Sequence, residues 1–134
     1  MNKKCSGKSV GAIIEKNNRI LFLDRAFLPL GWAPPAGHID KNEQPSQAIA
    51  REIKEETGLD ALKCDLLLAE KNVPDACVMG GKFHDWWIFK CECQGEVNLN
   101  KKESKDFAWL ALNEIENKAD IINVWQRFLR KINL

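Results

Sequence analysis

Gly37–Leu59 reads GHIDKNEQPSQAIAREIKEETGL, and this stretch decides the fold. Pro45 suits the first turn of a helix, because its missing N–H and fixed φ cost nothing there. Gly58 suits the position just past a helix, because glycine adopts positive φ readily. The spacing therefore predicts a helix over Pro45–Thr57.

Three acidic side chains share one side of this helix. At about 100° per residue, Ile49 and Ile53 fall in one sector, and Glu52, Glu55 and Glu56 fall in the adjoining arc. A solvated charged face is the alternative interpretation, but such a face usually interleaves lysines four residues from its acids. Carboxylates that border an apolar face without matching cations favour a hard divalent ion such as Mg²⁺, which binds oxygen ligands.

Arg51 is the exception among these charges, because it lies close to the acids in sequence. It is one turn from Glu55 and can also reach back to Glu43, so two pairings are open. The second pairing would hold the loop that contains Glu43 against the helix.

The segment resembles the signature box of the Nudix hydrolases and matches it at every defining position. Those positions are Gly37, Glu43, Arg51, Glu52, Ile53, Glu55, Glu56, Gly58 and Leu59. Flanking features are similar to the family as well: a strand pair before the box, a Trp-x-x-Pro loop leading into it, and a Glu-Ser-x-x-x-x-Trp stretch after it. The resemblance extends over most of the chain and implies an α+β Nudix fold, an α/β/α sandwich around a mixed β-sheet.

The resemblance also implies a reaction, the hydrolysis of a phosphoanhydride bond in a nucleoside di- or triphosphate or a related nucleoside diphosphate-linked substrate. It implies that Glu52, Glu55 and Glu56 coordinate Mg²⁺, with Mn²⁺ as a possible substitute, and that the Gly37 carbonyl adds a ligand. Which carboxylate activates the water stays open. Glu103 occupies the place where many members supply a further acid, and an ordinary loop glutamate between lysines is the equal alternative. Arg51 is placed with the catalytic residues, and Glu43 and Gly58 are placed with the structural ones.

Four residues outside the acidic cluster are candidates for substrate binding. Arg25 ends a strand where related hydrolases often place a cation near phosphates, although charged residues commonly finish strands. Trp32 lies in the loop that leads to the box, where it either stacks on a nucleobase or anchors the loop. His38 and His84 are candidate phosphate contacts, and a strand-edge position is the favoured interpretation of His84.

The substrate itself stays open at this level. Many nucleotide-sanitising relatives carry Pro-Gly-Gly before the box, whereas this chain has Pro35-Ala36-Gly37-His38, a variant similar to broad-specificity nucleoside di- and triphosphate members. ADP-ribose and dinucleoside polyphosphates are the main rival substrates. A non-catalytic nucleotide-sensing module is the rival class, but such modules commonly lose box acids and this chain keeps them all.

Composition predicts a single domain over residues 1–134 and a small-molecule partner. The chain is 45% hydrophobic, enough for one core, and its 20 basic and 19 acidic residues give a net charge of +1. Such a balance gives no overall field to hold nucleic acid or an anionic membrane, so we expect no stable nucleic-acid complex and count an RNA-end role as less favoured. No apolar run reaches membrane-spanning length. The oligomeric state is not readable.

The cysteines favour a reducing compartment. Five are present, an odd number without Cys-x-x-Cys spacing, which argues against a disulfide framework and a zinc ribbon. Cys91 and Cys93 alternate onto one face of an expected strand, where packing is the favoured role. We expect a cytoplasmic protein.

Hydrophobic patterning predicts the other elements. Trp86 and Trp87 are adjacent in an expected strand, so they should point to opposite faces, with one of them in a ligand cleft. The expected strands are Val10–Ile14, Arg19–Asp24, Leu62–Glu70, His84–Cys93 and Phe107–Leu110, with a loop over Phe27–Asp40 and a second helix over Ala119–Ile132.

Overall fold

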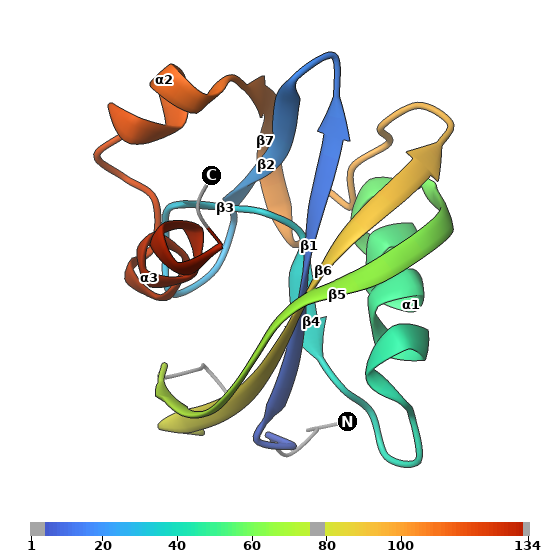
Figure 1. Ribbon diagram of the computed structural model, residues 1–134, viewed down its shortest axis with the longest axis vertical. Helices are drawn as coiled ribbons and strands as arrows, with labels where there is room; N and C mark the ends of the chain where they lie inside the picture. Colours follow the sequence, from blue (N-terminus) through green and yellow to red (C-terminus); the bar gives the residue numbers. More distant parts are fainter. Residues whose placement is uncertain (1–4, 76–79, 133–134) are drawn as a thin grey trace.

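The computed structural model describes residues 5–75 and 80–132, and it contains a mixed seven-stranded sheet with helices on both sides (Figure 1). The elements in chain order are β1 (Lys8–Lys16), β2 (Arg19–Arg25), β3 (Trp32–Ala33), β4 (Ala36–His38), α1 (Pro45–Thr57), β5 (Asp60–Pro74), β6 (Phe83–Gln94), β7 (Ser104–Leu110), α2 (Leu112–Glu116) and α3 (Asn123–Lys131).

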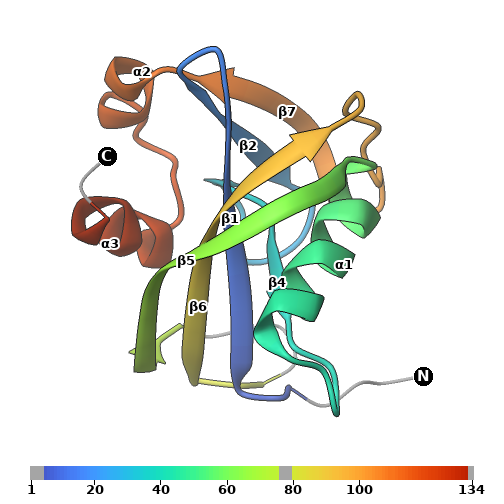
Figure 2. The ribbon, with the colours of Figure 1, turned by 45° about the vertical axis from the view of Figure 1, so that its right-hand side comes forward.

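The sheet places α1 and α3 on opposite sides, as Figures 1 and 2 show. Its strand order is β3-β2-β1-β6-β5, with β4 paired to β1 and β7 paired to β2. The β1–β6 pair is parallel and the other pairs are antiparallel. The expected α+β class and the sandwich around a mixed sheet are confirmed.

β1 runs through the middle of the molecule and supplies both cores. Its side chains alternate, so Val10 and Ile14 pack in the cluster that contains α1, and Ile13 packs in the cluster that contains α3. Gly11 has no side chain because the Trp125 ring of α3 occupies the space that a Cβ would need. Burial on both faces explains why this strand reads as a continuous apolar run.

The helix predicted over Pro45–Thr57 is confirmed at both ends. The backbone N–H of Gln44 donates to the Gln47 side chain at 2.8 Å, which satisfies a group at the start of α1. At the other end Gly58 adopts φ of 74° and its N–H donates to the Lys54 carbonyl at 3.0 Å. These two caps fix where α1 begins and ends.

The structure corrects several predictions of secondary structure. The region interpreted as a loop, Phe27–Asp40, contains β3 and β4. The last helix begins at Asn123 and not at Ala119, because Ile121 forms a strand-like bridge with Trp32. The short helix α2 was not predicted at all, and the strands β5, β6 and β7 extend beyond their predicted bounds because backbone pairing continues past the apolar runs.

The adjacent tryptophans point to opposite faces, as predicted. Trp86 packs with the α3 side, and Trp87 packs with the α1 side. Cys91 and Cys93 share a face of β6, and Cys64, Cys91 and Cys93 are free thiols. Cys77 lies outside the described residues.

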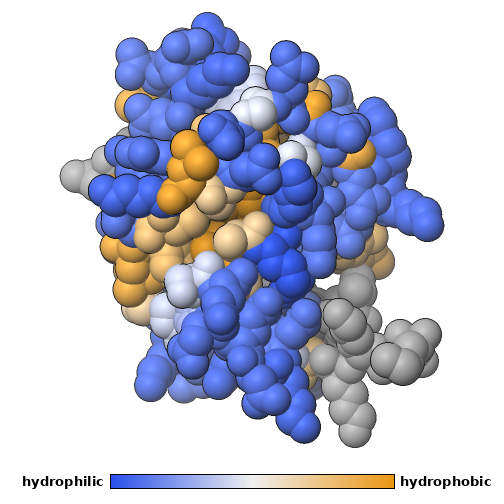
Figure 3. Space-filling model, turned by 90° about the vertical axis from the view of Figure 1, so that its right-hand side faces the viewer, coloured by the Kyte–Doolittle hydropathy of each residue, from blue (hydrophilic) through white to orange (hydrophobic). Residues whose placement is uncertain are grey.

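The surface beside α1 is largely hydrophilic, with an apolar area next to it (Figure 3). Leu62, Leu66 and Leu67 of β5 are among the exposed large hydrophobic side chains. Within the described residues, none of the helices has both the length and the apolar character needed to span a membrane.

Candidate active site

A cavity of about 300 Å³ lies where β2, β4, α1, β6 and α3 meet. It brings together most of the residues that the sequence singled out, although they come from distant parts of the chain. Those on its lining are Arg25, Gly37, His38, Arg51, Glu52, Glu55, His84 and Glu103.

Glu56 lies behind this lining, and its Oε1 accepts a hydrogen bond from the backbone N–H of Ala36 at 3.0 Å. Glu52 and Glu56 are both buried, whereas the Glu55 side chain is 55% exposed. The three acids thus border the apolar face of α1, as their spacing predicted. They differ in how much water reaches them.

Burial controls the protonation of the two inner acids. It raises the pKa of Glu52 to about 7, and the neighbouring Arg51 opposes this shift. Burial also raises the pKa of Glu56 well above its ordinary value, and the negative charges of Glu52 and Glu103 act in the same direction. These carboxyls therefore need a nearby positive charge to stay ionised at neutral pH.

Gly37 is required by the close approach of β4 to α1. A Cβ at this position would overlap the carboxylate of Glu52. Absence of a side chain leaves the Gly37 backbone beside the carboxylate oxygens. The carboxylates supply oxygen donors of the kind that hard divalent cations bind.

Arg51 makes both of the pairings that the sequence left open. Its guanidinium donates two hydrogen bonds to Glu43, at 2.8 and 2.9 Å, and one to Glu55 at 3.1 Å. It also donates to Glu52 and to the His38 carbonyl, each at 2.9 Å. Arg51 therefore locks the loop and β4 against α1 while it orients two of the three acids.

The sequence identified Arg51 as the exception among these charges, and the structure shows that it pairs with Glu52 as well as with Glu55. Gly58 and Glu43 occupy the structural positions expected of them, as a helix end and a loop clamp.

Arg25 and Glu103 approach the cavity from the strand ends. The Arg25 guanidinium donates to the carbonyls of Pro29 at 2.7 Å and Leu28 at 3.3 Å, and it lies 4.2 Å from the centre of the Phe27 ring. Burial lowers its pKa, and the negative charges of Glu56, Asp75 and Glu103 oppose that change. A cation thus faces the acids across the cavity.

Trp32 lies outside the lining of this cavity. Its backbone N–H donates to the Asp120 carbonyl at 2.8 Å, and the Lys118 ammonium lies 4.5 Å from its ring centre. These contacts favour the loop-anchoring interpretation over base stacking.

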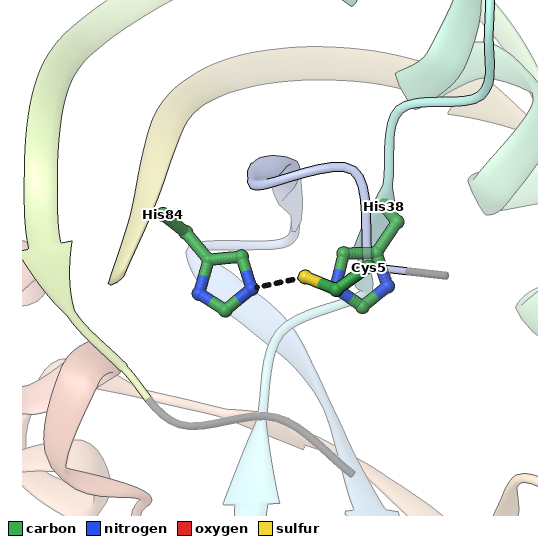
Figure 4. A group of neighbouring side chains, drawn as sticks. All are labelled: Cys5, His38 and His84. Atoms are coloured by element: carbon green, nitrogen blue, oxygen red, sulfur yellow. Dashed lines mark hydrogen bonds between the residues drawn. The ribbon is translucent and has the colours of Figure 1, made fainter. Parts of the chain in front are cut away.

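His84 is not an edge residue, because it is only 1% exposed and β6 lies between β1 and β5. Its Nε2 lies 3.0 Å from the Cys5 sulfur, and the His38 ring is close by (Figure 4). Burial lowers the pKa of His38, and the positive charge of His84 adds to this effect. Neither the burial of His84 nor this cluster was foreseen.

Sequence reasoning also missed part of the lining. Asp75 follows the end of β5, and Trp125 closes the cavity from α3. Trp86 of β6 also lies on the lining, as expected of one of the two adjacent tryptophans. The helical spacing of apolar residues in the last helix included Trp125, but this pattern indicated only a core position. Asp75 lies in no pattern that marks a site.

Comparisons with known proteins agree with this geometry. The NUDIX domain family matches residues 6–131. An 8-oxo-dGTP diphosphatase of Proteus vulgaris is 37% identical over 70 residues, which cover 50% of this chain and 62% of that protein. An RNA pyrophosphohydrolase of Vibrio vulnificus is 27% identical over 112 residues, which cover 74% of this chain and 65% of that protein. The matches thus span less than two thirds of each of these relatives.

The fold comparison points the same way. The crystal structure of a MutT NUDIX hydrolase from Burkholderia pseudomallei superimposes with a TM-score of 0.80 at 22% identity. The match covers 93% of this chain and 96% of that chain. At this identity the likeness establishes the fold.

Proposed function

We propose, from the premise that this chain belongs to the NUDIX family and is a Nudix hydrolase, that it hydrolyses a phosphoanhydride bond of a nucleoside di- or triphosphate in a Mg²⁺-dependent reaction. The observation that carries the proposal is the buried acidic pair at the cavity. Glu52 lies on the lining beside Gly37, Glu56 is hydrogen-bonded to the neighbouring Ala36, and the positive charge of Arg25 acts on Glu56.

The divalent cation would be held by Glu52, Glu55, Glu56 and the Gly37 carbonyl, with Glu103 as a further acid. When bound, such an ion neutralises charge on phosphate oxygens and lowers the pKa of a water molecule. Mn²⁺ has similar oxygen preferences and should substitute. Because ligand carboxyls must lose their protons, the raised pKa values of Glu52 and Glu56 make ion binding release protons.

The chain's own residues supply binding and orientation. Arg25 is fixed by its hydrogen bonds to two backbone carbonyls and presents its charge to the cavity, where phosphate oxygens would be bound. Arg51 holds Glu52 and Glu55 in place by direct hydrogen bonds. One carboxylate of the cluster accepts a proton from the attacking water.

A second candidate substrate is the 5′-triphosphate end of RNA. Relatives named RNA pyrophosphohydrolases match 74–77% of this chain at 26–28% identity. Free nucleotides remain the first choice, because a net charge of +1 provides little attraction for a polyanion. We further propose a cytoplasmic location, which suits the free thiols of Cys64, Cys91 and Cys93.

The test is hydrolysis in ¹⁸O-labelled water across nucleoside di- and triphosphates, 8-oxo-dGTP, ADP-ribose, dinucleoside polyphosphates and 5′-triphosphorylated RNA. Glu56→Gln runs beside it, with Glu92→Gln, an exposed glutamate of β6, as the matched control. The proposal expects Mg²⁺-dependent cleavage of the nucleotides by wild type and Glu92→Gln, with loss in Glu56→Gln. Folded, cation-loaded protein that cleaves none of them would overturn it.

A further inference from the structure

We propose that Cys5, His38 and His84 form a second metal site, separate from the α1 carboxylates, which takes a thiophilic divalent cation such as Zn²⁺. The three residues come from the segment before β1, from β4 and from β6, and Figure 4 shows their side chains converging. We call this group the thiol–imidazole cluster.

The distances between the donor atoms fit one small ion. All three ligand atoms lie within 4.8 Å of one another. Zn–S and Zn–N bonds of about 2.3 and 2.0 Å at a tetrahedral angle place sulfur and nitrogen about 3.5 Å apart. The Cys5 sulfur lies 3.6 Å from Nε2 of His38 and 3.0 Å from Nε2 of His84. Of these two sulfur–nitrogen distances, only the second has to widen, by about half an ångström on this estimate.

A carboxylate lies near the second ring nitrogen of His84, as is common for metal-binding histidines. Among the described residues, Nδ1 of His84 is buried without a hydrogen-bond partner, and Oδ2 of Asp75 lies 3.6 Å from it. Asp75 is itself held by a hydrogen bond from the Trp86 indole N–H at 3.2 Å. Histidine ligands commonly donate their second N–H to such a carboxylate, which fixes the ring and strengthens the bond to the metal.

The chain also leaves room for the cluster. Gly81 passes so close that a Cβ would lie 2.5 Å from the Cys5 sulfur and 3.0 Å from Nε2 of His84. A larger residue at this position would push the two donor atoms apart. Because Gly81 has no side chain, the backbone can pack closely against the sulfur and the nitrogen on one side of the cluster.

The donor types decide which ion each group takes. Sulfur and imidazole nitrogen select Zn²⁺ and similar ions, whereas carboxylate and carbonyl oxygen select Mg²⁺. Three protein ligands leave a fourth tetrahedral position for water or a ligand atom. Because His38 and His84 also line the 300 Å³ cavity, an ion in this cluster lies beside the proposed nucleotide site.

The experiment uses Co²⁺ as a spectroscopic probe for Zn²⁺. Reduced full-length protein without a histidine tag is titrated with Co²⁺, and the sulfur-to-cobalt charge-transfer absorption is recorded. We expect about one ion per chain, displaced by Zn²⁺. Cys5→Ser should lose the band. Cys64→Ser should keep it, because Cys64 is a half-buried free thiol of β5 and outside the cluster.

Two further variants sharpen the result. Asp75→Asn keeps all three donors and should weaken Co²⁺ binding about 10- to 100-fold, the usual cost of losing an outer partner. Glu56→Gln should keep the band, which separates the cluster from the carboxylate site. Circular dichroism confirms that each variant is folded.

The proposal is overturned if folded wild-type protein with titratable thiols shows no band, or if Cys5→Ser retains it. Loss of the band in Cys64→Ser to the same extent as in Cys5→Ser would also overturn it. The assay detects a metal–sulfur bond and not turnover, so its failure leaves the hydrolase proposal intact.

Discussion

The cavity is bordered by two groups of side chains with opposite chemical character. α1 contributes Glu52, Glu55 and Glu56, whose carboxyl groups offer only oxygen atoms. The thiol–imidazole cluster offers sulfur and nitrogen, and burial lowers the pKa of its His38. The contrast teaches that hard and soft donors can lie beside the same small cavity. We therefore expect each group to bind a different kind of ion. We also expect their contributions to the free energy of unfolding to change with pH in opposite directions.

The largest expected effect comes from removing one charge from the carboxylate group. Glu56→Gln keeps the size of the side chain and an acceptor for the Ala36 N–H, but it removes a negative charge from the proposed ion site. Because cation stabilisation of the transition state contributes several kcal/mol, we expect turnover to fall about 1000-fold. Steady-state kinetics at saturating Mg²⁺ measure this, with Glu92→Gln as the control. If the turnover of Glu56→Gln lies within about tenfold of wild type, Glu56 does not have the proposed role in the reaction.

A pH series separates the two groups in metal-free protein. The folded pKa of Glu52 is about 7 against an ordinary value of 4.5, so the unfolded chain releases this proton first as pH rises. The stability that depends on protonated Glu52 is complete below pH 4.5 and is lost as pH rises through 7. We expect the free energy of unfolding to fall by about 3 kcal/mol across this window.

Urea denaturation in the presence of a chelator measures this fall. Glu52→Gln should flatten the slope, because its amide does not ionise, and Glu92→Gln should keep it. A wild-type stability that stays constant between these pH values would contradict the burial argument.

The contact between β4 and α1 can be broken by one methyl group. Gly37→Ala places a Cβ against the Glu52 carboxylate, and we expect a loss of about 1–3 kcal/mol in stability. In a Glu52→Ala background the same substitution should cost less, because the overlapping atoms are gone. Equal costs in both backgrounds, measured by urea denaturation, would show that the overlap is not the cause.

The smallest expected effect tests the other side of the comparison. Burial lowers the pKa of His38 below 6.5, so its contribution to stability is present above pH 6.5 and is lost as pH falls through the folded pKa. This slope is opposite in sign to that of Glu52. His38→Gln should therefore reduce the loss of stability on the acid side in the same urea series. If His38→Gln loses as much stability below pH 6.5 as the wild type does, His38 is not the source of that loss.

The sequence predicted one group and missed the other for a physical reason. The helix α1 depends on local signals, Pro45 at its start and Gly58 at its end, and a 3.6-residue period places its acids without any tertiary information. Cys5 is 33 residues from His38 and 79 residues from His84, so their meeting depends on the parallel pairing of β1 with β6 and of β4 with β1. No local pattern encodes that meeting.

The same reasoning explains the smaller errors. β3 and β4 are short strands that exist because β2 and β1 offer them edges to pair with, and a Pro- and Gly-rich sequence gives no sign of this. His84 begins a strand, which suggested an edge, but β6 lies inside the sheet. In both cases the deciding contact is far away in the sequence.

The most direct test of the central claim is Mn²⁺ binding followed by electron paramagnetic resonance, which needs no knowledge of the substrate. We predict that wild-type protein binds Mn²⁺, that Glu56→Gln loses this binding, and that Glu92→Gln and Cys5→Ser retain it. Equal Mn²⁺ binding by wild type and folded Glu56→Gln would contradict the claim that the carboxylates of α1 hold the ion.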